Sequence, residues 1–237
     1  MAHRSVSVGL LLLAGSWLPL PLRAADSATV QEILDGKEVF INQKMAVVRQ
    51  KATAPELVST KNSRAQLAFS GGAGARLNRF SLLRLGASCF LLEKGQVLVS
   101  GPQNGCTSSA RLSVRGTNYV IDVQEDGSAE LSVLEGSVEV EPTRDGEPTG
   151  APSTTVEAGQ KAQLSAEGVI LTLLKLSAGD YTSILGGPLF TGFSSSMPGL
   201  AALESYLNLS VPGVSLPALP AAPSVPSIPS IPRFSFF

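Results

Sequence analysis

Histidine is almost absent from this 237-residue chain, since the only one is His3 near the N-terminus. Most general acid-base and nucleophilic mechanisms use histidine, and so do many zinc sites. A chain without histidine beyond its first residues cannot assemble a Ser-His-Asp, Cys-His or His-metal site. We therefore expect a protein that is not an enzyme, with no catalytic residues, no metal and no cofactor.

An excess of positive charge is also missing, because 18 lysines and arginines face 19 aspartates and glutamates. Binding a nucleic acid backbone needs such an excess, so nucleic acid is not an expected partner. The same balance argues against attraction to an anionic lipid surface by net charge. Charged residues make up 16% of the chain and aromatic residues 5%, a composition that suits a β-rich envelope protein.

Long apolar runs are missing except at the N-terminus. There His3 and Arg4 precede an apolar run from Val6 to Leu20, and the small pair Ala24-Ala25 follows it. This order is typical of a secretory signal peptide. Glycines and prolines interrupt the run, which is shorter than the roughly 20 residues of a membrane span. We expect residues 1–25 to export the chain to the periplasm or cell envelope, leaving no transmembrane span in the mature chain. An uncleaved membrane tether is the alternative.

Cysteine is scarce, with Cys89 and Cys106 as the only two. An even number of cysteines in an oxidising compartment favours a disulfide, and two buried free thiols are the alternative. A bond that closes so short a loop contributes about 3 kcal/mol to stability.

Short apolar runs separated by Gly, Asn, Asp or Ser fill residues 45–170, and this pattern is typical of strands and turns. Leu131 and Val133, and then Val138 and Val140, alternate with polar residues, so each strand is expected to have one buried face. Asp126-Gly127 between two such runs predicts a hairpin with a type I′ turn.

The regions on either side of this β domain differ in composition. We interpret residues 26–44 as an entry segment, where Val30, Ile33 and Leu34 have the spacing of a short helix. Residues 171–210 are interpreted as a loop-rich extension with a short helix near 199–209, and residues 211–237 as a semi-rigid Pro-rich tail. The predicted fold is all-β, an antiparallel sheet roll or short β-solenoid-like sandwich with a short C-terminal helix and a Pro-rich tail.

A weak repeat runs through the β domain, in which an acidic residue stands just ahead of Gly95, Gly136 and Gly159. Glycine supplies backbone angles that other residues resist, so we expect a tight turn between strands at each position. These turns are expected along one edge of the roll. Coincidence among common turn residues is the alternative.

Six arginines in the β region form a loose basic group. They could bind an acidic peptide or polysaccharide, and solvated strand faces explain them equally well. The six are Arg64, Arg76, Arg79, Arg84, Arg111 and Arg115.

Several segments, in order, resemble the FecR domain. The more specific are Arg115-Gly116-Thr117 and Leu134-Glu135-Gly136-Ser137-Val138, and Val156-Glu157-Ala158-Gly159-Gln160 closes the series. The resemblance implies a periplasmic all-β domain, with Arg115, Gly116, Thr117, Leu134, Glu135, Gly136 and Gly159 as the family-motif residues. The family's named member relays a signal from an outer-membrane receptor to a sigma factor through a cytoplasmic N-terminal segment. In this chain we expect a signal peptide in that place.

Two functions remain open at this point. The first is a non-catalytic binding or signalling module of the cell envelope, with an envelope protein as partner. The second is a structural protein, or one that binds a cell-wall glycan polymer.

Overall fold

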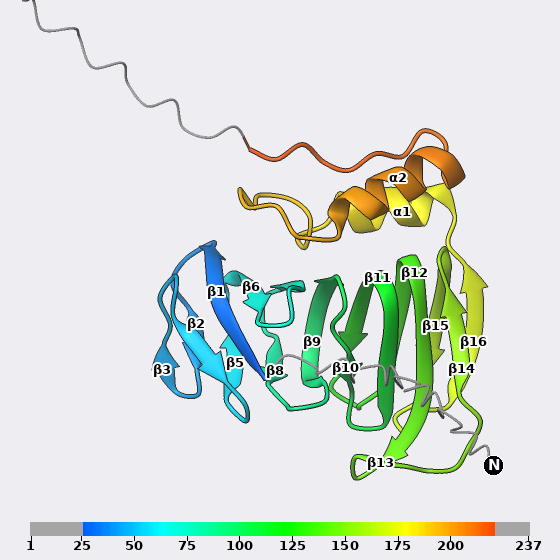
Figure 1. The fold of residues 1–237 in the computed structure, drawn as a ribbon, viewed down its shortest axis with the longest axis horizontal. Coiled ribbons are helices and arrows are strands. Elements are labelled where there is room, and N and C mark those ends of the chain that lie inside the picture. Colours follow the sequence, from blue (N-terminus) through cyan, green and yellow to red (C-terminus); the bar gives the residue numbers. More distant parts are fainter. Residues whose placement is uncertain (1–25, 221–237) are drawn as a thin grey trace, which may run out of the picture.

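The computed structural model describes residues 26–220, and the predicted signal peptide at 1–25 lies outside them, as does the end of the predicted tail at 221–237. The described chain is mostly β-strand with two helices (Figure 1), which confirms the all-β prediction. The elements are β1 (Ser27–Leu34), β2 (Val39–Ile41), β3 (Lys44–Met45), β4 (Lys51–Thr53), β5 (Leu57–Thr60), β6 (Arg64–Phe69), β7 (Gly74–Leu77), β8 (Leu82–Arg84), β9 (Phe90–Ser100), β10 (Gly105–Cys106), β11 (Ala110–Val123), β12 (Ala129–Arg144), β13 (Glu147–Pro148), β14 (Thr154–Glu157), β15 (Gln160–Leu164), β16 (Ile170–Lys175), α1 (Ala178–Leu185) and α2 (Leu200–Ser210).

The strands form one rolled sheet whose two layers enclose the main core. One layer runs in the order β4-β1-β6-β7-β9-β11-β12-β15-β16, and the other contains β3-β2-β5-β8, β10 and β14. The long strands β9, β11 and β12 belong to both layers, because their two halves pair with different neighbours. Stacked rings of Phe69 and Phe90, 5.9 Å apart, join the layers across the core.

The long strands bend at glycines. In β12 the core residues are Leu131 and Val133 before Gly136 but Val138 and Val140 after it, so the buried set changes from odd to even numbers. An inserted residue is needed for both halves to face the same core, since side chains alternate along a strand. Gly136 supplies it with a φ of 81°.

The predicted turns at the repeated glycines are therefore only partly right. Gly159 lies in the turn between β14 and β15, whereas Gly95 and Gly136 lie inside β9 and β12. They also do not share one edge: Gly95 is paired with Val123 at one end of β11, while Gly136 lies beside Gly116 at the middle of that strand. The error has a physical reason, because a positive φ is as useful in a bulge as in a turn.

The predicted hairpin at Asp126-Gly127 joins β11 and β12, but its turn is not type I′. Only Gly127 has a positive φ, of 84°, and its N–H donates to the carbonyl of Gln124. The Asp126 carboxylate instead accepts from the N–H of Ser128 at 2.9 Å. Two consecutive positive φ angles occur one hairpin later, at Asp145 (54°) and Gly146 (84°), between β12 and β13.

The entry segment proves to be part of the sheet. Residues 27–34 form β1, which pairs with both β4 and β6, so the helix-like spacing of Val30, Ile33 and Leu34 was misleading. A bulge between Val30 and Glu32 shifts the register there. That shift breaks the two-residue alternation that would have marked the strand.

The C-terminal part of the described chain covers the outside of one layer (Figure 1). Helices α1 and α2 and the loop between them pack on Leu98, Val120 and Leu134, which point away from the main core. Ser177 begins α1 with a reciprocal capping box to Asp180. We call residues 176–216 the cap. Within the predicted tail, Val214 is 8% exposed and packs in this second core, so the start of the tail belongs to the cap.

Candidate interaction surfaces

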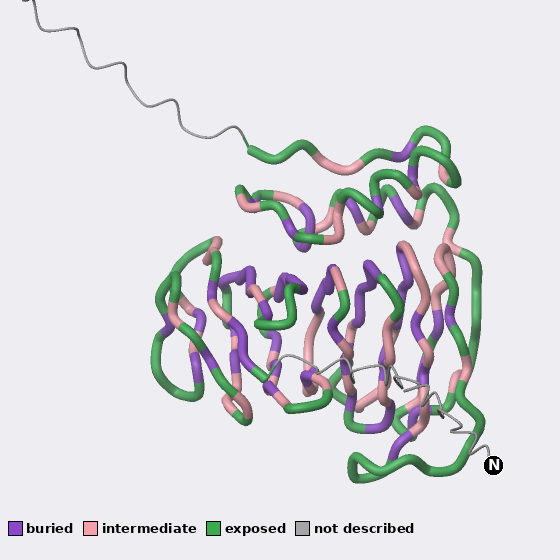
Figure 2. Tube along the Cα trace, viewed as in Figure 1, coloured by how far each residue is buried: buried purple, intermediate pink, exposed green. Residues whose placement is uncertain are grey.

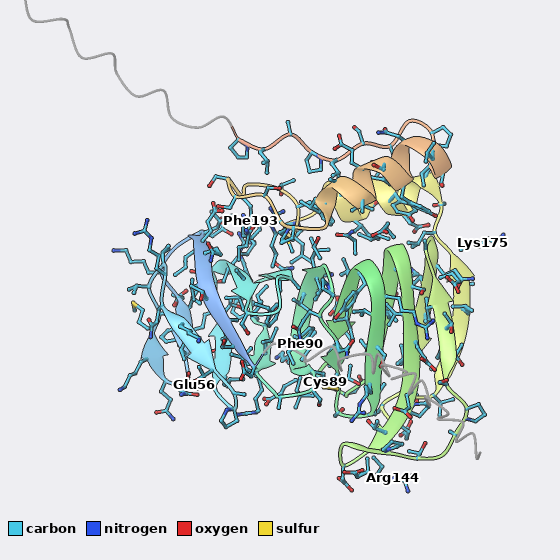
Figure 3. All side chains as sticks on the ribbon, in the orientation of Figure 1. Glu56, Cys89, Phe90, Arg144, Lys175 and Phe193 are labelled. Carbon is cyan, nitrogen blue, oxygen red and sulfur yellow. A yellow bond between two sulfur atoms is a disulfide. The ribbon has the colours of Figure 1, made fainter. Side chains whose placement is uncertain are left out.

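The two cysteines form a disulfide between the start of β9 and the end of β10, with 5.9 Å between the Cα atoms of Cys89 and Cys106. Phe90 and Leu91 pair in parallel with Gly105 and Cys106 at this place. The bond closes the loop that brings β10 between β9 and β11. The adjoining Phe90 is buried in the main core, and Figure 3 labels it beside Cys89.

The family-motif residues meet at the bend of β11 and β12. The Thr117 hydroxyl donates to the carbonyl of Ser137 at 3.1 Å, and Asn118 donates to the Glu135 carboxylate at 2.8 Å. A side chain at Gly136 would place its Cβ 2.3 Å from the Gly116 carbonyl oxygen.

The remaining motif residues surround this bend. The N–H of Gly159 donates to the carbonyl of Val133, Leu134 is buried under the cap, and Arg115 is exposed. The motif thus specifies a bend, and it brings no reactive groups together.

Two of the six arginines are buried beneath the cap. Arg64 is 8% exposed and Arg76 1%, and their guanidinium carbons lie 5.4 Å and 4.3 Å from the centroid of the Phe193 ring. Figure 3 shows Phe193 in the loop that faces the strands. Arg76 donates to the carbonyls of Leu189 (3.1 Å) and Ser195 (2.9 Å). These arginines hold the cap, and neither is free for the acidic ligand considered above.

Glu32 completes this contact from the neighbouring strand. Its carboxylate accepts from the N–H and hydroxyl of Ser194, at 3.0 Å and 2.9 Å, and from the N–H of Ser195 at 3.1 Å. Burial raises the pKa of Glu32, but these hydrogen bonds outweigh it and leave the pKa below its ordinary value. Glu32 is paired with Gln66, and Gln66 with Arg76, so one row across three strands binds the cap.

The charge of Arg76 survives its burial. Desolvation lowers the pKa of Arg76 to about 10, with the charge of Glu32 opposing the shift and that of Arg64 adding to it. The guanidinium is therefore protonated at neutral pH and needs the cap carbonyls as acceptors.

The other four arginines lie nearer to solvent. Arg79 pairs with Asp35, and Arg84 pairs with Glu93 at 2.7 Å, both with side chains more than 40% exposed. Arg111 is half-buried and Arg115 exposed. The six arginines form no common binding surface.

Strand β16 is an open edge of the sheet. Among the residues that the structure describes, it pairs only with β15. Its side chains of Leu171, Leu173 and Leu174 are 64%, 42% and 53% exposed. In Figure 2, exposed residues, drawn in green, run along this end of the roll. An uncovered apolar edge is able to pair with another strand.

Pockets and metal sites give weaker signals. Two pockets, of about 430 and 440 Å³, lie around the cap and are lined in part by its own residues, such as Leu200 and Tyr206. Within residues 26–220, no group of three metal-ligating side chains gathers. Neither helix of this part is long and apolar enough to cross a membrane.

Sequence reasoning missed both the cap contact and the open edge. The apolar run Val169-Ile170-Leu171 followed by Leu173-Leu174 was a readable signal, because Lys175 is the one charged residue of β16 and edge strands usually carry more. Nothing in the local sequence marks Arg64 and Arg76 as buried, since the carbonyl groups that accept their hydrogen bonds are about 120 residues away along the chain.

Comparison with known proteins identifies the β region. Residues 56–139 match the FecR protein family. No curated protein matches the chain. Two solved structures of a candidate anti-sigma factor from Parabacteroides distasonis are similar at 16% identity, with TM-scores of 0.46 and 0.42. They cover 64% and 65% of this chain and 73% and 88% of their own. The motifs at 115–117 and 134–136 lie inside the family match, so the resemblance seen in the sequence is confirmed over residues 56–139.

Proposed function

We propose that this protein is an exported, non-catalytic signalling module of the cell envelope, which binds an envelope protein through the free edge of β16. The FecR domain supports a signalling or regulatory role. The disulfide is consistent with an oxidising compartment, as expected after export. The observation that carries the proposal is the uncovered edge of β16.

The backbone of β16 is oriented for strand addition. Leu176 donates its N–H to the carbonyl of Gly159 in the turn before β15. Backbone N–H and C=O groups alternate in direction along a strand. The N–H and C=O groups of Leu173 and Lys175 therefore point away from β15. A partner strand would gain these hydrogen bonds and cover the exposed leucines, which is the way in which many peptide-binding domains extend a sheet.

Crosslinking and pulldown from envelope fractions test the proposal. Wild type is expected to recover a specific envelope protein, and Leu173→Pro is expected to lose it. Proline removes an N–H that points to the partner and leaves the pairing with β15 intact. A Leu171→Glu/Leu173→Glu variant adds charge to the same edge and should also fail to recover the partner.

The matched control is Phe80→Glu, which puts a charge on a comparably exposed apolar residue in the loop between β7 and β8. It should recover the partner normally. Equal recovery by all variants would refute the use of β16. Retention of the wild type on purified wall polymer, without any protein partner, would favour the structural or glycan-binding alternative.

A further inference from the structure

The opposite end of the roll carries an exposed apolar tip. We define the tip as residues 44–51, which comprise β3, the start of β4 and the loop between them. Met45, Val47 and Val48 are 57%, 63% and 48% exposed. Figure 1 shows β3 at one end of the molecule and β16 at the other.

A buried alanine and several hydrogen bonds fix the loop so that its two valines face solvent. Ala46, only 3% exposed, is buried in the main core, and its N–H donates to Val39. Arg49 donates its N–H to the carbonyl of Val30, and the Gln50 side chain accepts from the N–H of Val47 at 3.1 Å. Both ends of the loop are thus anchored while Val47 and Val48 contact solvent.

The composition of this turn is unusual. Gln50 donates its N–H to the carbonyl of Val47, so residues 47–50 form a turn with the sequence Val-Val-Arg-Gln. Arg49 has a φ of 71°, a conformation that glycine or asparagine adopts more easily. Backbone strain of this kind gathers at binding sites, and here it lies beside two exposed valines.

Positive charge surrounds these apolar side chains. Lys44, Arg49 and Lys51 are all exposed, and none of them forms an ion pair within the described part of the chain. The segment 37–61 contains five lysines and arginines and two glutamates, in a chain whose formal charge is −1. The net charge of the whole chain argued against lipid binding, but this end of the molecule is locally basic.

From this arrangement we infer that the tip docks on an anionic lipid bilayer. Valine and methionine side chains enter the interface while lysine and arginine contact the headgroups. This contact is independent of the proposed use of β16, and it would leave that edge at the far end of the molecule, open to a partner.

Vesicle co-sedimentation of the exported full chain tests the inference. The protein is expected to bind vesicles of mixed phosphatidylglycerol and phosphatidylethanolamine, and to bind phosphatidylcholine vesicles much more weakly. Lys44→Gln/Lys51→Gln should weaken binding by about 25-fold, at about fivefold for each cation. Val47→Glu/Val48→Glu should weaken it by at least about tenfold. High salt should release the wild type, because it screens exposed charges.

Val169→Glu is the matched control, since it makes the same chemical change at a comparably exposed valine before β16, at the other end of the molecule, and should leave vesicle binding unchanged. Circular dichroism of every variant verifies folding. The inference is overturned if the wild type ignores anionic vesicles, if the tip variants bind as well as the wild type, or if the control loses binding equally. It is also overturned if the tip variants change only the oligomeric state, which would identify the tip as a protein interface.

Discussion

The guanidinium of Arg76 lies over the ring of Phe193, with 4.3 Å between the guanidinium carbon and the ring centroid. The two residues join β7 to the loop between α1 and α2, and both are fully buried. Phe193 also lies within 5.4 Å of the Arg64 guanidinium carbon, so one ring contacts two cations. This contact attaches the cap to β7, which lies within the residues that match the FecR family.

Replacing Phe193 by alanine should release the loop. The change removes a buried aromatic ring and leaves two cations without their ring contact, at a cost of about 3–5 kcal/mol. Urea denaturation measures the loss, and limited proteolysis should show new cleavage between residues 186 and 199. Phe80→Ala is the control, because Phe80 is 55% exposed and its loss should have little effect. Equal stability of both variants would contradict the buried role of Phe193.

Arg76→Lys should fail to replace arginine. A lysine ammonium lacks the planar fork that donates to Gln66, Leu189 and Ser195 together, so buried acceptors are left unpaired. We expect a loss of about 2–3 kcal/mol in the free energy of unfolding. Arg84→Lys, at an exposed ion pair with Glu93, should change it by less than about 0.5 kcal/mol. Similar losses at both positions would show that the fork geometry is unimportant.

Glu32→Gln should change the response of stability to acid. The folded-state pKa of Glu32 is below its ordinary value of 4.5, so its hydrogen bonds stabilise the protein above that pH. That contribution is lost as the pH falls through the folded-state pKa. The variant should be less stable than wild type by about 1 kcal/mol at neutral pH, because solvent weakens hydrogen bonds to a half-buried carboxylate. Thermal unfolding between pH 7 and pH 3 should show the difference shrinking in acid, and a constant difference would exclude this role.

Comparing Gly136→Ala with Gly146→Ala separates the cost of a steric clash from the cost of an unfavourable backbone angle. Gly136 and Gly146 have φ angles of 81° and 84°, but only Gly136 has a backbone oxygen 2.3 Å from the position of an added Cβ. Gly146→Ala should cost about 1 kcal/mol for the angle alone. Gly136→Ala should cost at least about 2 kcal/mol more, because the bend of β12 must shift. Chemical denaturation of both variants tests this, and equal losses would mean that the bend tolerates a side chain.

Much of the β domain was readable from local pattern. Alternation identified the strands around Leu131 and Val133, and the glycine repeat marked real changes of backbone direction at Gly95, Gly136 and Gly159. The switch of the buried set from Val133 to Val138 was also visible in the sequence. It could have distinguished a bend inside one strand from a turn between two.

The sequence by itself determined the all-β class, the resemblance to the FecR family and the glycines at which the backbone changes direction. These are local properties, because side-chain alternation and positive φ act over a few neighbouring residues. Only the tertiary structure decided that Arg64 and Arg76 are buried, that β1 belongs to the sheet, and that β16 and the tip are left uncovered by residues 26–220. Each of these depends on which distant segment supplies a partner, and contacts across more than a hundred residues leave no mark in local spacing.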